Sequence, residues 1–141
     1  MSIWFGQYDL ESINAKGKNS MSGNLGIEVS RIFENGIVGE MPVSEKTKQP
    51  FGLLHGGASC VLAETLGSIA SNMIIDTDLF AAVGQSINAS HIKSASEGEV
   101  KGVCTAIHIG KKSHVWEINI YNEEDEIVCA SRLTMAIIKK N

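Results

Sequence analysis

The sequence has no apolar run long enough to span a bilayer and no basic leader followed by an apolar stretch. It also has no excess of positive charge, because 16 Asp and Glu outnumber 12 Lys and Arg and the formal net charge is −4. A chain with a pI near 5.5 repels a nucleic acid backbone. We therefore expect neither nucleic acid nor a membrane as partner, and we expect the protein to stay in the cytoplasm.

Cysteine is scarce, and its three positions Cys60, Cys104 and Cys129 lie far apart without a C-x-x-C pair. Such usage is typical of reduced thiols packed in a core, not of a disulfide framework or a zinc site. No His, Cys and Asp set has metal-ligand spacing, and G-x-S-x-G of the serine hydrolases is absent. We expect no metal and no cofactor. A nucleophilic role for Cys60 stays open, because it precedes Glu64 by one helical turn.

The 141 residues fit one compact domain, which we expect to cover residues 1–141. Helical spacing predicts one long helix over 56–75 and a short surface helix within 7–19, while 21–26 has the composition of a turn. Strands are predicted over 27–33, 37–43, 81–94, 99–109, 115–122 and 127–138. Asn35-Gly36 predicts a hairpin, because both residues tolerate a positive φ. One dominant helix followed by an antiparallel meander predicts an α+β fold.

The predicted long helix has two different faces. An apolar stripe recurs every three or four residues and is expected to lie on a sheet: Leu62, Leu66, Ile69 and Met73. A second face has mostly small side chains: Gly57, Cys60, Glu64, Ser68 and Ser71. A carboxylate is costly to bury, so Glu64 is either solvated or has a chemical task. The other residues on this face of the helix lack long charged side chains, which favours a chemical role for Glu64 over a solvated surface position.

Residues 49–59 (QPFGLLHGGAS) and 62–68 (LAETLGS) resemble the active-site segment of the hotdog-fold acyl-coenzyme A thioesterases. Similarity is strongest to the branch that hydrolyses aromatic esters such as 1,4-dihydroxy-2-naphthoyl-coenzyme A, which is similar to the thioesterases of phenylacetic acid degradation. The resemblance continues at 88–91, 102–104, 108–110 and 131–134, and so covers most of the chain. It implies a hotdog fold, in which a bent antiparallel sheet wraps one long central helix. It also implies hydrolysis of a coenzyme A thioester at a dimer interface, commonly within a dimer of dimers.

Glycine at the helix start has a chemical meaning of its own. The first helical turn has unpaired N–H groups and a partial positive charge, and Gly56 lacks a Cβ that would keep a carbonyl away. Alternatively, the glycines only cap the helix, and His55 before it is only a structural hydrogen-bonding group. Glu64 follows Gly56 by eight residues, which is ~12 Å along the axis. If both act on one thioester, Glu64 must come from a neighbouring subunit, so we predict a dimer.

By resemblance, the catalytic group is Glu64, Gly56, His55, Gln49 and Ser68. Glu64 would act as nucleophile or as general base, which the sequence does not separate. Gln49 and His55 would hold and polarise the thioester, and Ser68 would orient water or the carboxylate. The implied coenzyme A contacts are Gly84, His91, Ile92, Lys93 and Ser94, together with His108, Gly110, Lys111, Lys112 and Ser113.

The lysines among these contacts would attract the phosphates of coenzyme A on an otherwise acidic protein. For Lys111 and Lys112, an ordinary solvated turn is an equally good interpretation. The sequence departs from the family at Lys93, where an arginine is common, and a lysine would weaken a bidentate phosphate contact.

Two other functions fit the same fold. A hydratase or dehydratase would need a histidine and a carboxylate placed for proton transfer beside the carbonyl, and no segment matches that pattern. A non-catalytic acyl-coenzyme A sensor would have no reason to retain Glu64. The acyl group stays open among hydroxynaphthoyl, hydroxybenzoyl, phenylacetyl and medium-chain fatty acyl groups. Phe51, Met73 and Phe80 belong either to the core or to the acyl pocket. The expected partners are an acyl-coenzyme A substrate and further copies of the chain, as a dimer or a tetramer.

Overall fold

The computed structural model describes residues 2–141. The chain forms, in order, α1 (Leu10–Gly17), α2 (Met21–Asn24), β1 (Glu28–Phe33), β2 (Gly36–Pro42), α3 (Gly56–Ile74), β3 (Phe80–His91), β4 (Glu99–Ile109), β5 (Ser113–Tyr121) and β6 (Ile127–Lys139). None of the helices within these residues is long and apolar enough to cross a membrane.

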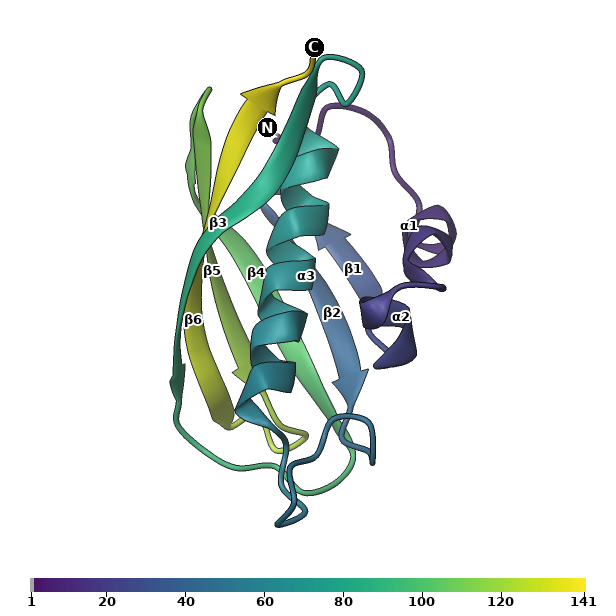
Figure 1. Cartoon of the computed structure of the whole chain (residues 1–141), viewed down its shortest axis with the longest axis vertical. Helices are drawn as coiled ribbons and strands as arrows, with labels where there is room; N and C mark the ends of the chain where they lie inside the picture. The colour runs from purple at the N-terminus through teal and green to yellow at the C-terminus, as the bar shows by residue number, and fades with distance from the viewer. Residues whose placement is uncertain (1) are drawn as a thin grey trace.

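The six strands form one antiparallel sheet in the order β1-β2-β4-β5-β6-β3. The sheet bends around α3, which lies along its concave face (Figure 1). The sheet does not close, so β1 and β3 are its two edges. One long helix held by a bent antiparallel sheet confirms the predicted α+β hotdog class.

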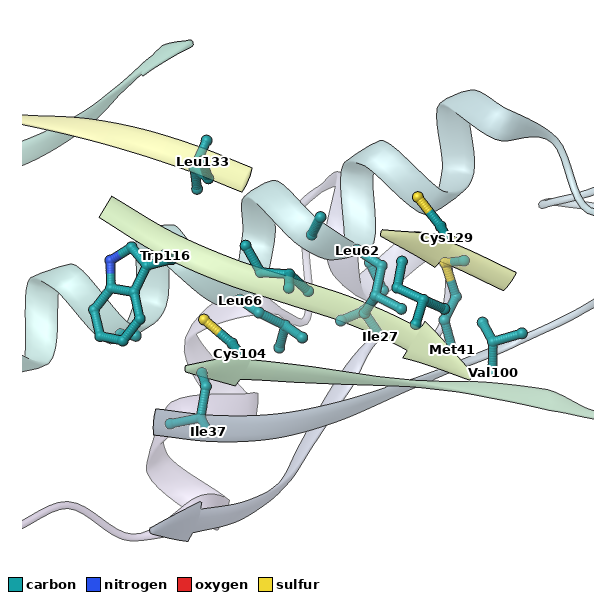
Figure 2. Packing of buried hydrophobic residues seen from close by; sticks show 14 of the residues in the cluster. Ile27, Ile37, Met41, Leu62, Leu66, Val100, Cys104, Trp116, Cys129 and Leu133 are labelled. Carbon is teal, nitrogen blue, oxygen red and sulfur yellow. The ribbon is translucent and has the colours of Figure 1, made fainter. Parts of the chain in front are cut away.

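The core lies between α3 and the sheet. Leu62 and Leu66 are fully buried and lie among residues contributed by the strands (Figure 2). The sheet presents glycine where Leu66 is closest: a Cβ at Gly39 would lie 2.4 Å from Cδ2 of Leu66, and a Cβ at Gly102 would lie 2.8 Å from its Cδ1. Burial of each leucine side chain contributes ~2 kcal/mol, so this contact fixes the helix on the sheet.

The predicted hairpin at Asn35-Gly36 exists, but the reason given for it is wrong. Neither residue has a positive φ. Gly36 is required instead by close approach, because a Cβ there would lie 2.0 Å from the carbonyl oxygen of Cys104 on β4 and 2.4 Å from the Phe33 ring. The glycine therefore allows β2 to pair with β4 at the start of the strand.

Three other expectations need correction. Residues 21–24 form the short helix α2 where a turn was predicted. Ser71 is fully buried and does not share the exposed face of Glu64. Phe51 is 89% exposed, so it belongs neither to the core nor to a pocket within one chain.

Ser71 instead holds a buried polar contact between α3 and β5. Its Oγ accepts a hydrogen bond from Nε1 of Trp116 at 2.8 Å and lies 2.9 Å from Nδ1 of His114. Burial, and then the charge of His108, lower the pKa of His114. The imidazole is therefore kept neutral, and the contact joins the end of α3 to the middle of the sheet.

The N-terminal segment is attached to the edge strand β1 by a side chain. Asn14 of α1 donates from Nδ2 to the Val29 carbonyl at 3.0 Å, and its Oδ1 accepts from the Val29 N–H at 2.8 Å. Asn14 thus pairs with Val29 as a neighbouring strand would. The register of β1 with β2 shifts directly after this residue, between Val29 and Arg31. Sequence analysis did not foresee this attachment.

Candidate active site

The first turn of α3 leaves one backbone donor free. Nδ1 of His55 accepts from the Gly57 N–H at 2.7 Å, and the His55 carbonyl accepts from the N–H groups of Ala58 at 2.9 Å and Ser59 at 3.2 Å. The Gly56 N–H has no acceptor among residues 2–141. His55 is therefore a cap for its own helix, and that capping leaves Gly56 as the available donor.

His91, at the end of β3, lies directly against Gly56. A Cβ at Gly56 would lie 2.9 Å from Nε2 and 3.1 Å from Cε1 of the His91 ring. The half-exposed glycine and the exposed imidazole thus share one corner of the molecule. The structure brings together here one residue expected to polarise a carbonyl and one expected to contact coenzyme A.

Gln49 lies in the loop that leads into α3. Its Oε1 accepts from the N–H groups of Phe51 at 2.5 Å and Leu53 at 3.4 Å, which fixes the amide orientation. The loop is tied to the helix start, because the Thr47 carbonyl accepts from the His55 N–H at 2.8 Å. The Nε2 group of Gln49 remains as a donor that the loop itself does not use.

Glu64 lies near the middle of α3, and its carboxylate is exposed. It rests against β3, since a Cβ at Gly84 would lie only 2.5 Å from Oε2 of Glu64. Ser68 follows one turn later and lines the same cavity. The lack of a Cβ at Gly84 therefore leaves room for the Glu64 carboxylate. This role differs from the coenzyme A contact that was expected of Gly84.

Cys60 lies one turn before Glu64, as expected, but its surroundings oppose a nucleophilic role. Burial raises the pKa of the Cys60 thiol, and the neighbouring charge of Glu64 raises it further. The sulfur is therefore held as a neutral thiol, which is the poorer nucleophile.

A cavity of about 740 Å³ lies between α3 and the N-terminal segment, and Glu64 is among the residues that line it. Most of the residues that line this cavity were not predicted from the sequence. They lie partly on α3 and partly on the N-terminal segment. The residues missed include Tyr8, Ile13, Lys16, Met21, Thr65 and Asn72. The only local signal for those on the N-terminal side was the apolar pair Leu10 and Ile13, which indicated a helix but not its partner.

Apart from Glu64 and Ser68 in the middle of α3, the expected site residues fall into two groups at opposite ends of the molecule. The start of α3 and the end of β3 lie at the lower end in Figure 1, and the hairpin between β4 and β5 lies at the upper end. The lower group contains Gln49, His55, Gly56 and residues 91–94. The upper group contains Gly84 on β3 and residues 108–113, because Ser113 pairs with Ala136 and Gly84 with Met135 on β6. One chain does not unite the two groups.

The lysines expected to bind phosphate have different surroundings. Lys93 forms an ion pair with Glu126, and this contact lowers the pKa of the Glu126 carboxyl. Lys111 and Lys112 are exposed and have no ion-pair partner within the described part of the chain. Lys93 must therefore release Glu126 before it can bind a phosphate, whereas Lys111 and Lys112 have no ion pair to break.

Residues 2–141 contain no group of three or more His, Cys, Asp or Glu placed to hold a metal ion.

Comparisons with known proteins agree with the fold. The family model described as "Thioesterase superfamily" matches residues 51–129. The 1,4-dihydroxy-2-naphthoyl-CoA hydrolase of Escherichia coli (strain K12) is 46% identical over 136 residues, which cover 96% of this chain and 99% of the relative. The proofreading thioesterase EntH of Cronobacter turicensis is 45% identical over 136 residues, covering 96% of this chain and 98% of the relative.

Two solved structures also match this chain over nearly its whole length. The crystal structure of a mutant of thioesterase PA1618 from Pseudomonas aeruginosa matches with a TM-score of 0.97 and 43% identity, covering 99% of this chain and 100% of that one. A thioesterase from Haemophilus influenzae matches with a TM-score of 0.94 and 41% identity, covering 97% of this chain and 95% of that one.

Proposed function

Because this chain belongs to the thioesterase superfamily and is a hydrolase of acyl-coenzyme A thioesters, we propose that two copies of it assemble each active site. In this proposal, the Gly56 N–H of one copy and the Glu64 carboxylate of the other act on one thioester. The observation that carries the proposal is the unused Gly56 donor ~12 Å from Glu64 along the same helix.

The open edge of β3 offers a way to bring the two groups together. Within one chain, Glu64 rests against Gly84 and Gly56 rests against His91, both on this strand. Antiparallel pairing of β3 with the partner's β3 about a two-fold axis near the middle of the strand would bring Gly84 close to the partner's His91. Glu64 would then face the partner's Gly56.

The surface of β3 supports this pairing. Residues 83–86 are all exposed, which is unusual for consecutive strand residues because their side chains alternate between faces. Val83 is 44% exposed and Ile92 is 57% exposed. A second copy on this edge would cover both apolar side chains and would satisfy the unpaired backbone groups of the strand.

The same pairing would unite the residues expected to bind coenzyme A. Residues 91–94 of one copy would lie beside the partner's Gly84, and the partner's hairpin 108–113 lies beyond it across β6 and β5. Lys111 and Lys112 would then supply cations near His91 and Lys93. We infer that the nucleotide end of coenzyme A binds across this junction.

In the proposed reaction, the thioester carbonyl oxygen accepts a hydrogen bond from the Gly56 N–H, and the positive end of the α3 dipole stabilises the negative charge that develops on it. Glu64 either attacks the carbonyl carbon or removes a proton from the attacking water. Either route breaks the bond between carbon and sulfur, and the leaving thiolate takes up a proton to give free coenzyme A. Attack by water gives the acid directly, whereas attack by Glu64 gives an anhydride that water then hydrolyses to the acid and the free carboxylate. His55 would stabilise the donor turn through the Gly57 N–H, and Gln49 would donate from Nε2. Ser68 would orient the water or the carboxylate.

We propose an aromatic acyl group, because one relative is named for the hydrolysis of 1,4-dihydroxy-2-naphthoyl-CoA. A cytoplasmic location is part of the proposal, since the three cysteines are free and Cys104 and Cys129 are buried, as is usual in a reducing compartment. A dimer of dimers is the proposed assembly.

Replacement of Glu64 tests the chemistry. Glu64→Gln should lower kcat by about 10³-fold or more while the fold is kept, because the amide can neither attack nor accept the proton. Release of free thiol from a panel of acyl-coenzyme A esters measures turnover, and circular dichroism measures the fold. A Cys60→Ser variant is the matched control one turn away and should retain activity. Wild-type turnover in Glu64→Gln would remove Glu64 from the mechanism.

A further inference from the structure

The N-terminal segment forms one wall of the cavity that contains Glu64. The opposite wall is the outer face of α3, and the N-terminal side is lined by Tyr8, Ile13 and Lys16 of the α1 region and by Met21 of α2. A volume of about 740 Å³ lies within the range of small-molecule sites. The cavity extends to Gly84, so its far end reaches the proposed dimer junction.

Hydrogen bonds, together with partial packing of Ile13 against the core, hold this wall in place. No residue of α1 or α2 is fully buried. Asn14 is paired with Val29, Nε1 of Trp4 donates to the Phe33 carbonyl at 2.9 Å, and the Phe5 N–H donates to the Met73 carbonyl at 2.9 Å. The inner side chains of the wall therefore remain available to whatever occupies the cavity.

The charges of the lining point to the chemistry of that occupant. Lys16 and Glu64 are the two charged side chains among the described residues that line the cavity, and they come from opposite walls. Lys16 has no ion-pair partner within 4 Å in residues 2–141. An ammonium group with free donors binds a phenolic or carboxylate oxygen well.

We propose that α1 and α2 form the acyl wall of the site, and that Lys16 selects acyl groups carrying an oxygen substituent remote from the thioester. The inference rests on the proposed function, because Glu64 must mark the position of the thioester carbon. The acyl group then extends from Glu64 towards α1, where a ring hydroxyl or carboxylate accepts a hydrogen bond from Nζ of Lys16. Tyr8 and Met21 contact the ring itself.

The test compares esters that differ in a single hydroxyl group. The pairs are 4-hydroxybenzoyl-coenzyme A with benzoyl-coenzyme A, and a hydroxynaphthoyl ester with its unsubstituted counterpart. In Lys16→Met, the ratio of kcat/KM for the hydroxylated over the plain ester should fall about tenfold in at least one pair. The methionine keeps most of the apolar stem, so the loss reports the ammonium group.

Lys18→Met is the matched control. Lys18 is exposed on the same segment, two residues further along, but does not line the cavity. It should leave both ratios unchanged. An unchanged ratio in both pairs for Lys16→Met, with turnover retained, would refute the role of Lys16 and leave the proposed function standing. No thiol release by the wild-type protein from any of the esters would refute the proposed function, and this inference with it.

Discussion

Mixed dimers of two inactive variants give a sharp test of whether each active site uses both chains. The first variant is Glu64→Gln, which removes the carboxylate. The second is Gly56→Pro, which removes the free N–H at the first helical position. Proline is tolerated there, and the extended backbone of His55 (φ −69°, ψ 132°) suits a following proline.

Each variant alone should be almost inactive, because loss of one oxyanion donor costs about 10²–10³ in kcat. Random co-assembly makes about half of the dimers mixed, and in a two-fold dimer with shared sites each mixed dimer has one site with both defects and one with neither. The mixture should therefore show about one quarter of the wild-type activity per chain. If each chain used its own Gly56 and Glu64, every site would have one defect and activity would stay near zero.

Co-expression of the two chains with different affinity tags allows the mixed dimers to be purified and assayed by thiol release. Gly56→Ala is the matched control, because it adds a Cβ near His91 as proline does but keeps the N–H. It should retain far more activity than Gly56→Pro. Equal losses in the two variants would show that the His91 contact matters and the hydrogen bond does not. Mixed dimers as inactive as their parents would refute the shared site.

Three further predictions concern stability. Ser71→Ala should lower the free energy of unfolding by about 1–3 kcal/mol in urea titrations, because Nε1 of Trp116 loses its buried acceptor; an unchanged value would mean that another acceptor replaces it. His114 has a pKa below its ordinary value of 6.5, so the unfolded chain binds the proton more readily and the free energy of unfolding should fall as pH drops below about 6.5. An imidazole titration midpoint at or above 6.5 by NMR would contradict this. Asn14→Ala should speed amide hydrogen exchange in α1 and α2 but not in α3, since the pairing with Val29 is lost; equal rates in all three helices would mean that Asn14 does not hold the segment.

Local sequence patterns were sufficient for most of the fold. The helical spacing of Leu62 and Leu66 predicted both α3 and the face that it buries, because a helix of 19 residues repeats the same contact over several turns. Trp116, Ile118 and Ile120 likewise occupy alternate positions along β5, and all three are buried. These elements are specified by residues close together in the chain, so their pattern is visible without the structure.

The cavity wall and the Ser71 contact were not predictable in that way. Ser71 has the same spacing from Ser68 as the members of the exposed face, and its partners in the core, His114 and Trp116, are 43 and 45 residues away in the sequence. Lys16 and Glu64 are likewise separated in sequence, and they line the same cavity because contacts such as that of Asn14 with Val29 fasten α1 to β1. Contacts between distant residues carry no local period, so sequence patterning does not reveal them.

The pairing of Asn14 with Val29 also bears on how many chains can join one sheet. An exposed strand edge invites another strand, and a chain with two such edges would add copies without limit. Here the amide of Asn14 occupies the outward backbone groups of Val29, which protects the β1 edge from strand addition at that point. In the proposed dimer, a second copy at the β3 edge would leave the two β1 strands as the ends of the shared sheet, each protected at Val29 by Asn14.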